Sequence, residues 1–180
     1  REVLGEHVQQ KGSLVNADKL RFDFAHTGAI SAEELKQTEQ RVNGQIRFNS
    51  NVDTQLLSYD DAVQQGAVAL FGEKYGDQVR VLTMGDGYSM ELCGGTHVKR
   101  TGDIGLFKIV SETGIAAGIR RVEAVTGDAA LSQVYADQVL LNDLSESLKV
   151  GRREVASKLE QLIAENRALT KQVAQMSQQL

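Results

Sequence analysis

The sequence predicts an α+β domain followed by a helical tail. Helix-capping signals occur twice in the first third of the chain, and three later stretches rich in β-branched residues are separated by glycines. From about residue 128 onward, apolar side chains recur every seven residues. A chain of 180 residues, 41% of them hydrophobic, is long enough for a domain at 1–127 and a tail at 128–180.

A β-hairpin and a helix are predicted at the N-terminal end. Residues 13–15 and 20–24 flank the turn-forming tetrapeptide 16–19. Ser31 and Glu34 have the spacing of a capping box, so we expect a helix to begin there. The apolar residues that share one face of this helix are Leu35, Val42 and Ile46.

A second helix and three strands complete the predicted domain. Asp60 can cap this helix, which we expect to reach about Leu70 and to stop near Gly72. The strands are predicted at 78–84, 104–110 and 119–125. Helices combined with mostly hairpin-linked strands favour an α+β fold in which a mixed or antiparallel sheet packs against the helices.

The tail has the pattern of a coiled coil. Its seven-residue seam consists of Leu141, Leu148, Val155, Leu162, Leu169 and Met176. Asn166 lies on the seam, where a polar residue fixes register or pairing at some cost in stability. Gly151 is expected to break the helix, since a glycine inside a helix costs about 1 kcal/mol relative to alanine. The apolar stripe must pack on something, so we expect either a later helix of a parent chain or self-association.

Composition excludes several classes of protein. A net charge of −4 is unlike that of a freestanding nucleic-acid binder, so a nucleic acid would be held at one small patch. The basic residues near the centre of the chain that can form such a patch are Lys99, Arg100, Lys108, Arg120 and Arg121. The single cysteine excludes an internal disulfide. Because no apolar run approaches the ~20 residues of a membrane span and no leader is recognisable, we expect a cytoplasmic protein without a membrane partner.

The most informative motif is Cys93-Gly94-Gly95-Thr96-His97. A thiolate and an imidazole at this spacing can reach one metal ion, and the two glycines allow the backbone to turn tightly between them. A lone cysteine is more often a small buried hydrophobic residue. The pentapeptide by itself leaves both interpretations open.

Longer blocks around this motif resemble one protein family. The block that contains it runs over 85–98 and continues at 101–109. Further matching blocks, in the same order as in the family, are 8–15, 20–24, 69–75 and 118–127. Together they resemble the second additional domain of alanyl-tRNA synthetases, the region that edits mischarged tRNA. The resemblance is close over 1–127, and the tail looks more loosely like the start of the family's C-terminal helical segment.

The resemblance implies an aminoacyl-tRNA deacylase that forms the editing part of an alanine–tRNA ligase. Serine or glycine wrongly esterified to the acceptor end of tRNA(Ala) would be released by water. Gln10 and Ser13 match positions that line the family's amino-acid pocket, where a hydroxyl can hydrogen-bond the seryl side chain. Arg120 matches the family's arginine in Gly-Ile-Arg-Arg and can hold a terminal phosphate or ribose, with Arg121 as second choice. The predicted catalytic set is therefore Gln10, Ser13 and Arg120.

The resemblance also implies a Zn²⁺ site, of which this chain holds half. Cys93 and His97 match two of the family's four ligands, and the other two are an upstream His-x3-His pair that this sequence lacks. We therefore expect the isolated chain to bind zinc weakly. His7 and His26 match neither missing ligand, and a structural or outer role suits them better. The carboxylates near Cys93, either outer acceptors or strand-end groups, are Asp86 and Glu91.

Three functions remain open at this stage. The first is a fragment of an alanine–tRNA ligase that carries the editing region, and a start at Arg1 without an initiating methionine favours it. The second is a freestanding trans-editing deacylase of the same fold, and the third is a non-catalytic tRNA-docking or dimerisation module. The sequence contains neither a Walker-type Gly-x4-Gly-Lys-Ser/Thr loop nor segments resembling a class II aminoacylation core, so adenylate formation is not expected of it.

Overall fold

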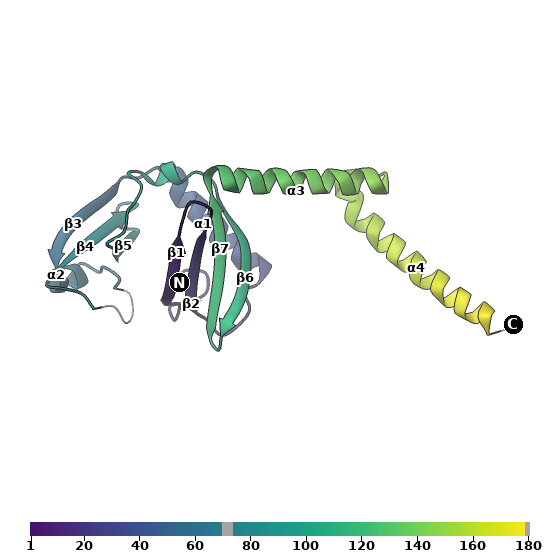
Figure 1. The fold of residues 1–180 in the computed structure, drawn as a ribbon, viewed down its shortest axis with the longest axis horizontal. Coiled ribbons are helices and arrows are strands. Elements are labelled where there is room, and N and C mark those ends of the chain that lie inside the picture. The colour runs from purple at the N-terminus through teal and green to yellow at the C-terminus, as the bar shows by residue number, and fades with distance from the viewer. Residues whose placement is uncertain (70–73, 179–180) are drawn as a thin grey trace. The chain divides into compact units, whose positions relative to one another are not determined.

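The computed structural model describes residues 1–69 and 74–178 (Figure 1). Its contacts divide the chain into two compact units, Arg1–Leu131 and Ser132–Leu180. In its described residues, the first unit contains two antiparallel sheets, two complete α-helices and the start of a third. The predicted α+β class is confirmed, with two antiparallel sheets where one sheet was expected.

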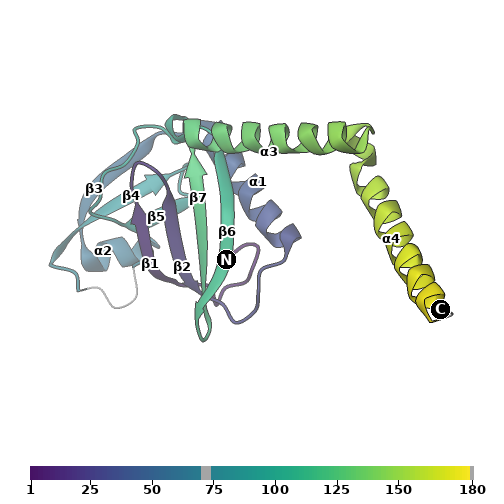
Figure 2. The same ribbon diagram turned by 45° about the vertical axis from the view of Figure 1, so that its right-hand side comes forward.

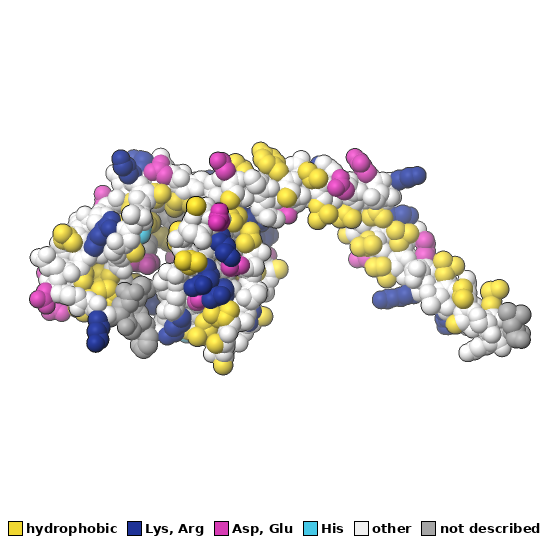
Figure 3. Space-filling model, in the orientation of Figure 1, with side chains coloured by type: hydrophobic (Ala, Val, Ile, Leu, Met, Phe, Trp, Pro, Cys, Tyr) yellow, Lys and Arg dark blue, Asp and Glu magenta, His cyan; other side chains and the backbone are white. Residues whose placement is uncertain are grey.

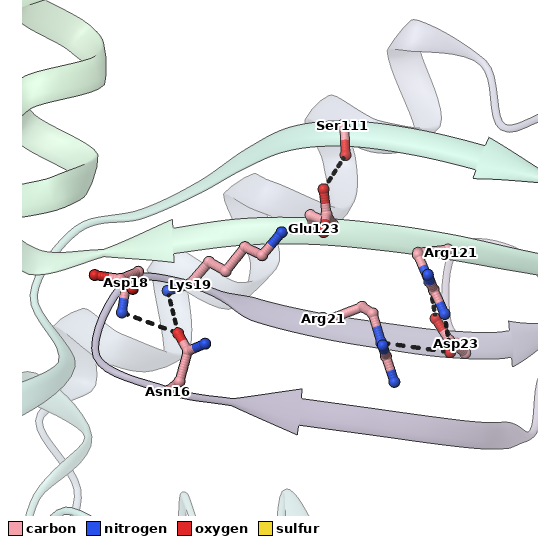
Figure 4. Close-up of polar contacts among 8 residues, drawn as sticks. All are labelled: Asn16, Asp18, Lys19, Arg21, Asp23, Ser111, Arg121 and Glu123. Carbon is pink, nitrogen blue, oxygen red and sulfur yellow. Dashed lines mark hydrogen bonds and ion pairs between the residues drawn. The ribbon is translucent and has the colours of Figure 1, made fainter.

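The first sheet has four strands in the order β1-β2-β7-β6, and all neighbours are antiparallel. The strands are β1 Gln10–Val15, β2 Leu20–Ala25, β6 Phe107–Ala116 and β7 Ile119–Thr126. β1 and β2 form the predicted hairpin. In its turn, the side chain of Asn16 accepts the backbone N–H groups of Asp18 and Lys19, both at 2.9 Å (Figure 4). An asparagine that binds amides in this way stabilises a tight turn.

Residues of this sheet alternate between an apolar and a charged face. Phe22 and Phe24 of β2 point to the apolar face, where their rings stack 5.7 Å apart and Phe24 is buried. Arg21 and Asp23 point to the opposite, charged face. The sheet therefore presents an apolar surface to the interior of the unit and an ionic surface on its other side.

Helix α1, Ala32–Phe48, begins at the predicted capping box. The N–H of Glu34 donates to Ser31 Oγ at 3.2 Å, and the N–H of Ser31 donates to Glu34 Oε2 at 2.8 Å. The Asn43 side chain donates to the carbonyl of Phe107 at 2.8 Å and accepts its amide at 2.9 Å. These two hydrogen bonds connect α1 to the first residue of β6 (Figures 1 and 2).

The second sheet is antiparallel, with its strands in the order β3-β4-β5. They are β3 Val52–Ser58, β4 Gln78–Met84 and β5 Ser89–Leu92. β3 was not predicted from the sequence. Only Val52 and Leu57 of this strand are even partly buried, so β3 lacks the apolar alternation by which a half-buried strand is recognised.

Helix α2, Tyr59–Gln64, is capped two residues earlier than predicted. The hydroxyl of Ser58 accepts the N–H of Asp61 at 3.1 Å, and Asp60 lies inside the first turn. Asp60 therefore adds negative charge near the helix N-terminus and is not the cap. The helix ends at Gln64, so the prediction that it reaches about Leu70 is wrong, since residues 65–69 are described and are not helical; Leu70 and Gly72 themselves lie outside the described residues.

The second unit is helical. α3, Gly127–Leu148, and α4, Val155–Ser177, are interrupted by a 3-10 turn at Arg152–Glu154. Gly151 lies in the interruption, where its N–H donates to Glu154 Oε2 at 2.9 Å. Hydrophobic side chains are exposed on both helices (Figure 3), among them Tyr135, Val139, Leu140, Leu144, Leu159, Leu169, Val173 and Met176. None of the helices in the described residues is both long and apolar enough to cross a membrane.

On the charged face of the first sheet, Asp23 is the centre of an ion-pair network (Figure 4). Arg121 donates to both of its carboxylate oxygens, from Nε at 2.7 Å and Nη2 at 2.9 Å, and Arg21 Nε lies 3.5 Å away. Asp23 is buried, and a Cβ at the facing Gly12 would come within 3.3 Å of its Oδ2. The hydrogen bonds from Arg121 lower the pKa of Asp23 below its ordinary value of 3.8, although burial opposes this shift.

We expect Asp23→Asn to lower the thermal unfolding midpoint at neutral pH by several degrees, because the amide keeps the shape but loses the charge that two arginines share. The folded-state pKa of Asp23 lies below its unfolded value, so its stabilisation is complete above the unfolded value and is lost as the pH falls through the folded one. The midpoints of variant and wild type, followed by circular dichroism from about pH 7 to about pH 2, should therefore converge.

The matched control is Asp53→Asn, because Asp53 is exposed in β3. It should change the midpoint little at any pH. An Asp23→Asn deficit that stays constant over the whole pH range would show that Asp23 stabilises the sheet through packing and not through its charge.

Candidate functional site

Cys93 and His97 lie in the irregular segment that follows β5. Leu92 is the last residue of β5 and pairs with Val81 of β4, so Cys93 is the first residue beyond the sheet. Cys93 Sγ and His97 Nε2 are 3.2 Å apart, with the cysteine partly buried and the histidine exposed. The structure therefore brings the two residues of the motif to one point.

Gly95 leaves open space beside both of these atoms. A Cβ at Gly95 would lie 3.7 Å from Cys93 Sγ and 3.8 Å from His97 Nε2. A Cβ at Gly94 would meet nothing within 4 Å. The two glycines of the motif therefore differ, because only Gly95 borders the sulfur and the imidazole nitrogen together.

The surroundings of His97 favour a neutral imidazole. Partial burial of the ring lowers the pKa of His97 below 6.5, and the positive charge of Arg80 lowers it further. Glu91 has a smaller, opposite effect on this pKa. A neutral imidazole is the form that binds a metal ion, so His97 needs to lose no proton at physiological pH.

The donor set fits zinc as two ligands of a tetrahedral site, since thiolate sulfur and imidazole nitrogen are both zinc ligands. In the part of the chain that the structure describes, no three His, Cys, Asp or Glu side chains are placed to bind one metal ion. Asp86 is exposed in the turn after β4, and Glu91 is exposed in β5, where it accepts from the hydroxyl of Ser89 at 3.3 Å. Neither acid therefore adds a third ligand.

Gln10, Ser13 and Arg120 lie in the first sheet. Gln10 and Arg120 are both paired with Phe24, from opposite sides, in one row across the sheet. Ser13 is paired with Phe22 in the neighbouring row. Because directly paired residues point to the same face, all three point to the apolar face of the sheet. Strand pairing thus places these residues on one surface, although about a hundred residues separate Gln10 and Ser13 from Arg120 in the chain.

Arg120 is held in place by Glu112. Its Nε donates to Glu112 Oε1 at 2.5 Å, and both side chains are largely buried. This ion pair raises the pKa of Arg120, so the guanidinium stays charged. Gly114 faces Arg120 from β6, and a Cβ there would come within 2.6 Å of Arg120 Nη1. The orientation of Arg120 therefore depends on the acid at 112 and on the missing side chain at 114.

Most of the predicted basic residues are engaged within the protein. The pairs are Arg121 with Asp23, Lys108 with Glu39, and Arg100 with Asn49 and Asn51. These contacts orient the side chains and neutralise part of their charge. These basic residues therefore offer less free positive charge than the sequence suggests, while Lys99 is exposed.

His7 and His26 contact each other. His7 Nε2 and His26 Nδ1 are 2.8 Å apart, and the two rings stack with centroids 5.1 Å apart. The backbone N–H of His26 donates to the carbonyl of Gly118 at 2.9 Å. The pair ties the N-terminal segment to the end of β2, and within the described residues it is not grouped with the Cys93–His97 motif.

A cavity of about 770 Å³ is lined by α1, the apolar face of the first sheet, the N-terminal segment and the β4–β5 hairpin of the second sheet. Its lining includes Phe22, Phe24, Leu35, Val42 and Ile46. None of the five predicted site residues is part of that lining. The cavity is lined by apolar side chains together with polar and charged ones such as Arg41 and Glu91, and it does not contain the predicted site residues.

Two residues near the candidate site were not singled out from the sequence. In the sequence, the one signal for Arg80 was a charged residue between two valines, Val79 and Val81. The structure shows that both valines are buried. Glu112 gave no signal, because its pairing with Arg120 depends on the register of β6 and β7. Both residues act through contacts that local sequence patterns do not reveal.

Residues 79–123 match the family described as the threonyl and alanyl tRNA synthetase second additional domain. The match contains both residues of the Cys93–His97 motif, as well as Glu112 and Arg120. On the first sheet, Gln10 and Ser13 lie outside the matched residues.

The chain is also similar to alanine–tRNA ligases of several organisms. The ligase of Saccharophagus degradans is 60% identical over 174 residues, which are 97% of this chain and 20% of the relative. Those of Nitrosococcus oceani and Nitrosomonas eutropha are 57% and 54% identical over all 180 residues, 20% and 21% of the relatives. The chain thus spans about a fifth of the length of these relatives. These matches show that the chain belongs to the alanyl-tRNA synthetase family, as a stretch that contains the second additional domain.

Proposed function

We propose that this chain is the editing region of an alanine–tRNA ligase and hydrolyses the ester bond of seryl- or glycyl-tRNA(Ala). The observation that carries the proposal is the 3.2 Å approach of Cys93 Sγ to His97 Nε2 within the stretch that matches the second additional domain. The similarity of the whole chain to alanine–tRNA ligases supports tRNA(Ala) as the substrate carrier. The aminoacylation reaction of those relatives is not assigned to this chain.

Ester hydrolysis by water does not require the protein to form a covalent intermediate. A water must be placed, the amino acid held, and the developing negative charge stabilised. Cys93 and His97 would hold Zn²⁺ together with ligands from another segment of the parent synthetase. When bound, zinc would either anchor the substrate or polarise the attacking water.

Ser13, Gln10 and Arg120 would recognise the substrate. Ser13 is exposed on β1, and its hydroxyl can bond the hydroxyl of a seryl group, which alanine lacks. Gln10, two strands from Arg120 in the same row, can bind the aminoacyl group from the other side. Arg120, oriented by Glu112, would bind the phosphate or ribose at the acceptor end.

Gly95→Ala should weaken metal binding roughly severalfold, because the new methyl group would be in van der Waals contact with both donor atoms. Gly94→Ala is the matched control, since its methyl group would enter open space. Both variants would be made in a synthetase that carries this chain, and binding would be measured by titration with Co²⁺ and competition with Zn²⁺. Equal affinities in the two variants would show that no metal binds next to Gly95.

In the same protein, Cys93→Ala should abolish deacylation of seryl- and glycyl-tRNA(Ala) with the fold intact. Ser13→Ala should instead change the ratio of the two rates by roughly 2- to 10-fold, the effect of one neutral hydrogen bond. The measurement is single-turnover hydrolysis of both esters. An equal loss on both would remove Ser13 from side-chain recognition.

The same assay separates the other two functions. Hydrolysis by this 180-residue chain alone would identify a trans-acting deacylase. If the parent synthetase hydrolyses neither ester, the region is a non-catalytic tRNA-docking or dimerisation module.

The helices of the second unit supply an interaction surface, and we propose that they self-associate. Apolar side chains are exposed along both α3 and α4, which a helix in water does not keep uncovered. Asn166 lies among them on the α4 seam, where a polar residue limits the pairings that are possible.

The chain should therefore sediment as an oligomer at micromolar concentration, and a chain shortened after Leu131 should be monomeric. The cut is placed there because Ala130 is fully buried and belongs to the first unit. Asn166→Leu should strengthen the association while reducing its specificity. A monomeric 180-residue chain would show that self-association does not cover this surface.

A further inference from the structure

We propose that Arg80 is a positioning residue, which holds the loop between Cys93 and His97 in the shape that brings the two donor atoms together. The role has a purpose only if the pair binds a ligand, and in this respect it rests on the proposed function. The contacts that assign it are independent of that function.

Arg80 holds this loop through both its side chain and its backbone. Its Nη1 donates to the carbonyl of Gly95 at 2.6 Å and to that of Gly94 at 3.3 Å. Its own carbonyl accepts the N–H of Cys93 at 3.1 Å. One residue of β4 thus contacts three successive residues at the start of the loop.

The backbone of Arg80 lies in a rigid part of the second sheet. Arg80 lies between Val79 and Val81, which are 6% and 2% exposed and belong to the core of the second sheet. Its backbone is paired on one side with Leu56 of β3, and on the other side the next residue, Val81, pairs with Leu92 of β5. The position of the guanidinium is therefore set by a strand in the middle of a sheet.

The loop itself has little other support. Among the described residues, no backbone N–H or carbonyl of residues 94–98 forms a hydrogen bond with another backbone group. Backbone hydrogen bonding resumes at Lys99, whose carbonyl accepts from the N–H of Val52. Glycines at 94 and 95 give the chain wide conformational freedom. Because the loop has neither backbone pairing nor side chains at these two positions, the contacts that limit it among the described residues are those of the Arg80 guanidinium and the approach of Cys93 Sγ to His97 Nε2.

A guanidinium suits this task for a physical reason. It is permanently charged, and its hydrogen bonds to carbonyl oxygens are stronger than those of a neutral donor. Binding two consecutive carbonyls orients both peptide planes, and so the direction in which the chain leaves Gly95 toward His97. Loss of the guanidinium should therefore widen the distribution of distances between Cys93 Sγ and His97 Nε2.

The first test is hydrogen–deuterium exchange of this chain without any metal. In Arg80→Met, which keeps most of the apolar stem, the amide of Cys93, which donates to the carbonyl of residue 80, should exchange faster, while those of Val81 and Leu82 stay protected. Arg80→Lys should give intermediate exchange, because an ammonium can reach a carbonyl but lacks the planar geometry. Arg47→Met is the matched control, since it removes an exposed guanidinium elsewhere in the same unit.

The second test is metal affinity in a synthetase that carries this chain, with Co²⁺ as the probe and thiolate-to-cobalt absorption as the readout. Arg80→Met should weaken binding by roughly 10- to 100-fold, the usual effect of losing a residue that orients a ligand. Arg80→Lys should recover part of this loss, and Arg47→Met should bind as the wild type does.

Unchanged exchange of the Cys93 amide in Arg80→Met, with unchanged cobalt affinity, would overturn the proposal. Faster exchange throughout β4 as well would show that Arg80 supports the sheet and does not position the loop. If Arg80→Met does not fold, Arg80→Lys decides the question by the same two readouts. A wild-type protein that binds cobalt but deacylates neither ester would contradict the proposed function and leave the role of Arg80 standing.

Discussion

The antiparallel pairing of β2 with β7 is the constraint on which the first unit depends. Asp23 and Arg121 are 98 residues apart in the chain and form its bidentate ion pair. The same pairing places Arg120 in one row with Gln10, with Phe24 between them. All of α1 and the whole second sheet lie in the loop that this pairing closes. Closing so long a loop costs chain entropy, and burial of the apolar face of the sheet offsets that cost.

The arginines of this protein organise the structure more than they charge its surface. Arg120 and Arg121 are neighbours in β7 and point to opposite faces, where each is bound to a different acid. Arg80 and Arg100 bind carbonyl or amide oxygens of nearby loops. Since guanidinium groups bind planar acceptors in fixed geometry, they can set the position of a loop or a strand. This use of arginine agrees with the net charge of −4, which is small and of the wrong sign for electrostatic capture of RNA.

The candidate metal ligands stand at the border between rigid and irregular structure. β4 and β5 are anchored by buried residues, and Cys93 follows directly on the last paired residue of β5. His97 lies in a loop that returns to the sheet only near Lys99 and to α1 through Thr101, which is buried. This arrangement combines one ligand fixed by a strand with one that depends on loop shape. Small changes in the loop therefore act directly on the distance between the two donor atoms.

Sequence alone determined the features of this protein that depend on neighbouring residues. The hairpin turn at Asn16 and the capping box of Ser31 and Glu34 could be predicted, because their hydrogen bonds join residues only two or three positions apart. The α+β class followed from such local signals for helices and strands. The Cys93–His97 pair could be nominated from its spacing for the same reason. β3 and the true cap of α2 escaped prediction, since β3 has almost no buried side chains and its last residue provides the cap. The pairing of Arg120 with Glu112 and that of Gly95 with Arg80 were decided by the tertiary structure alone. They depend on strand register and on the course of a glycine loop, which are set by packing between distant segments and leave no local periodicity in the chain.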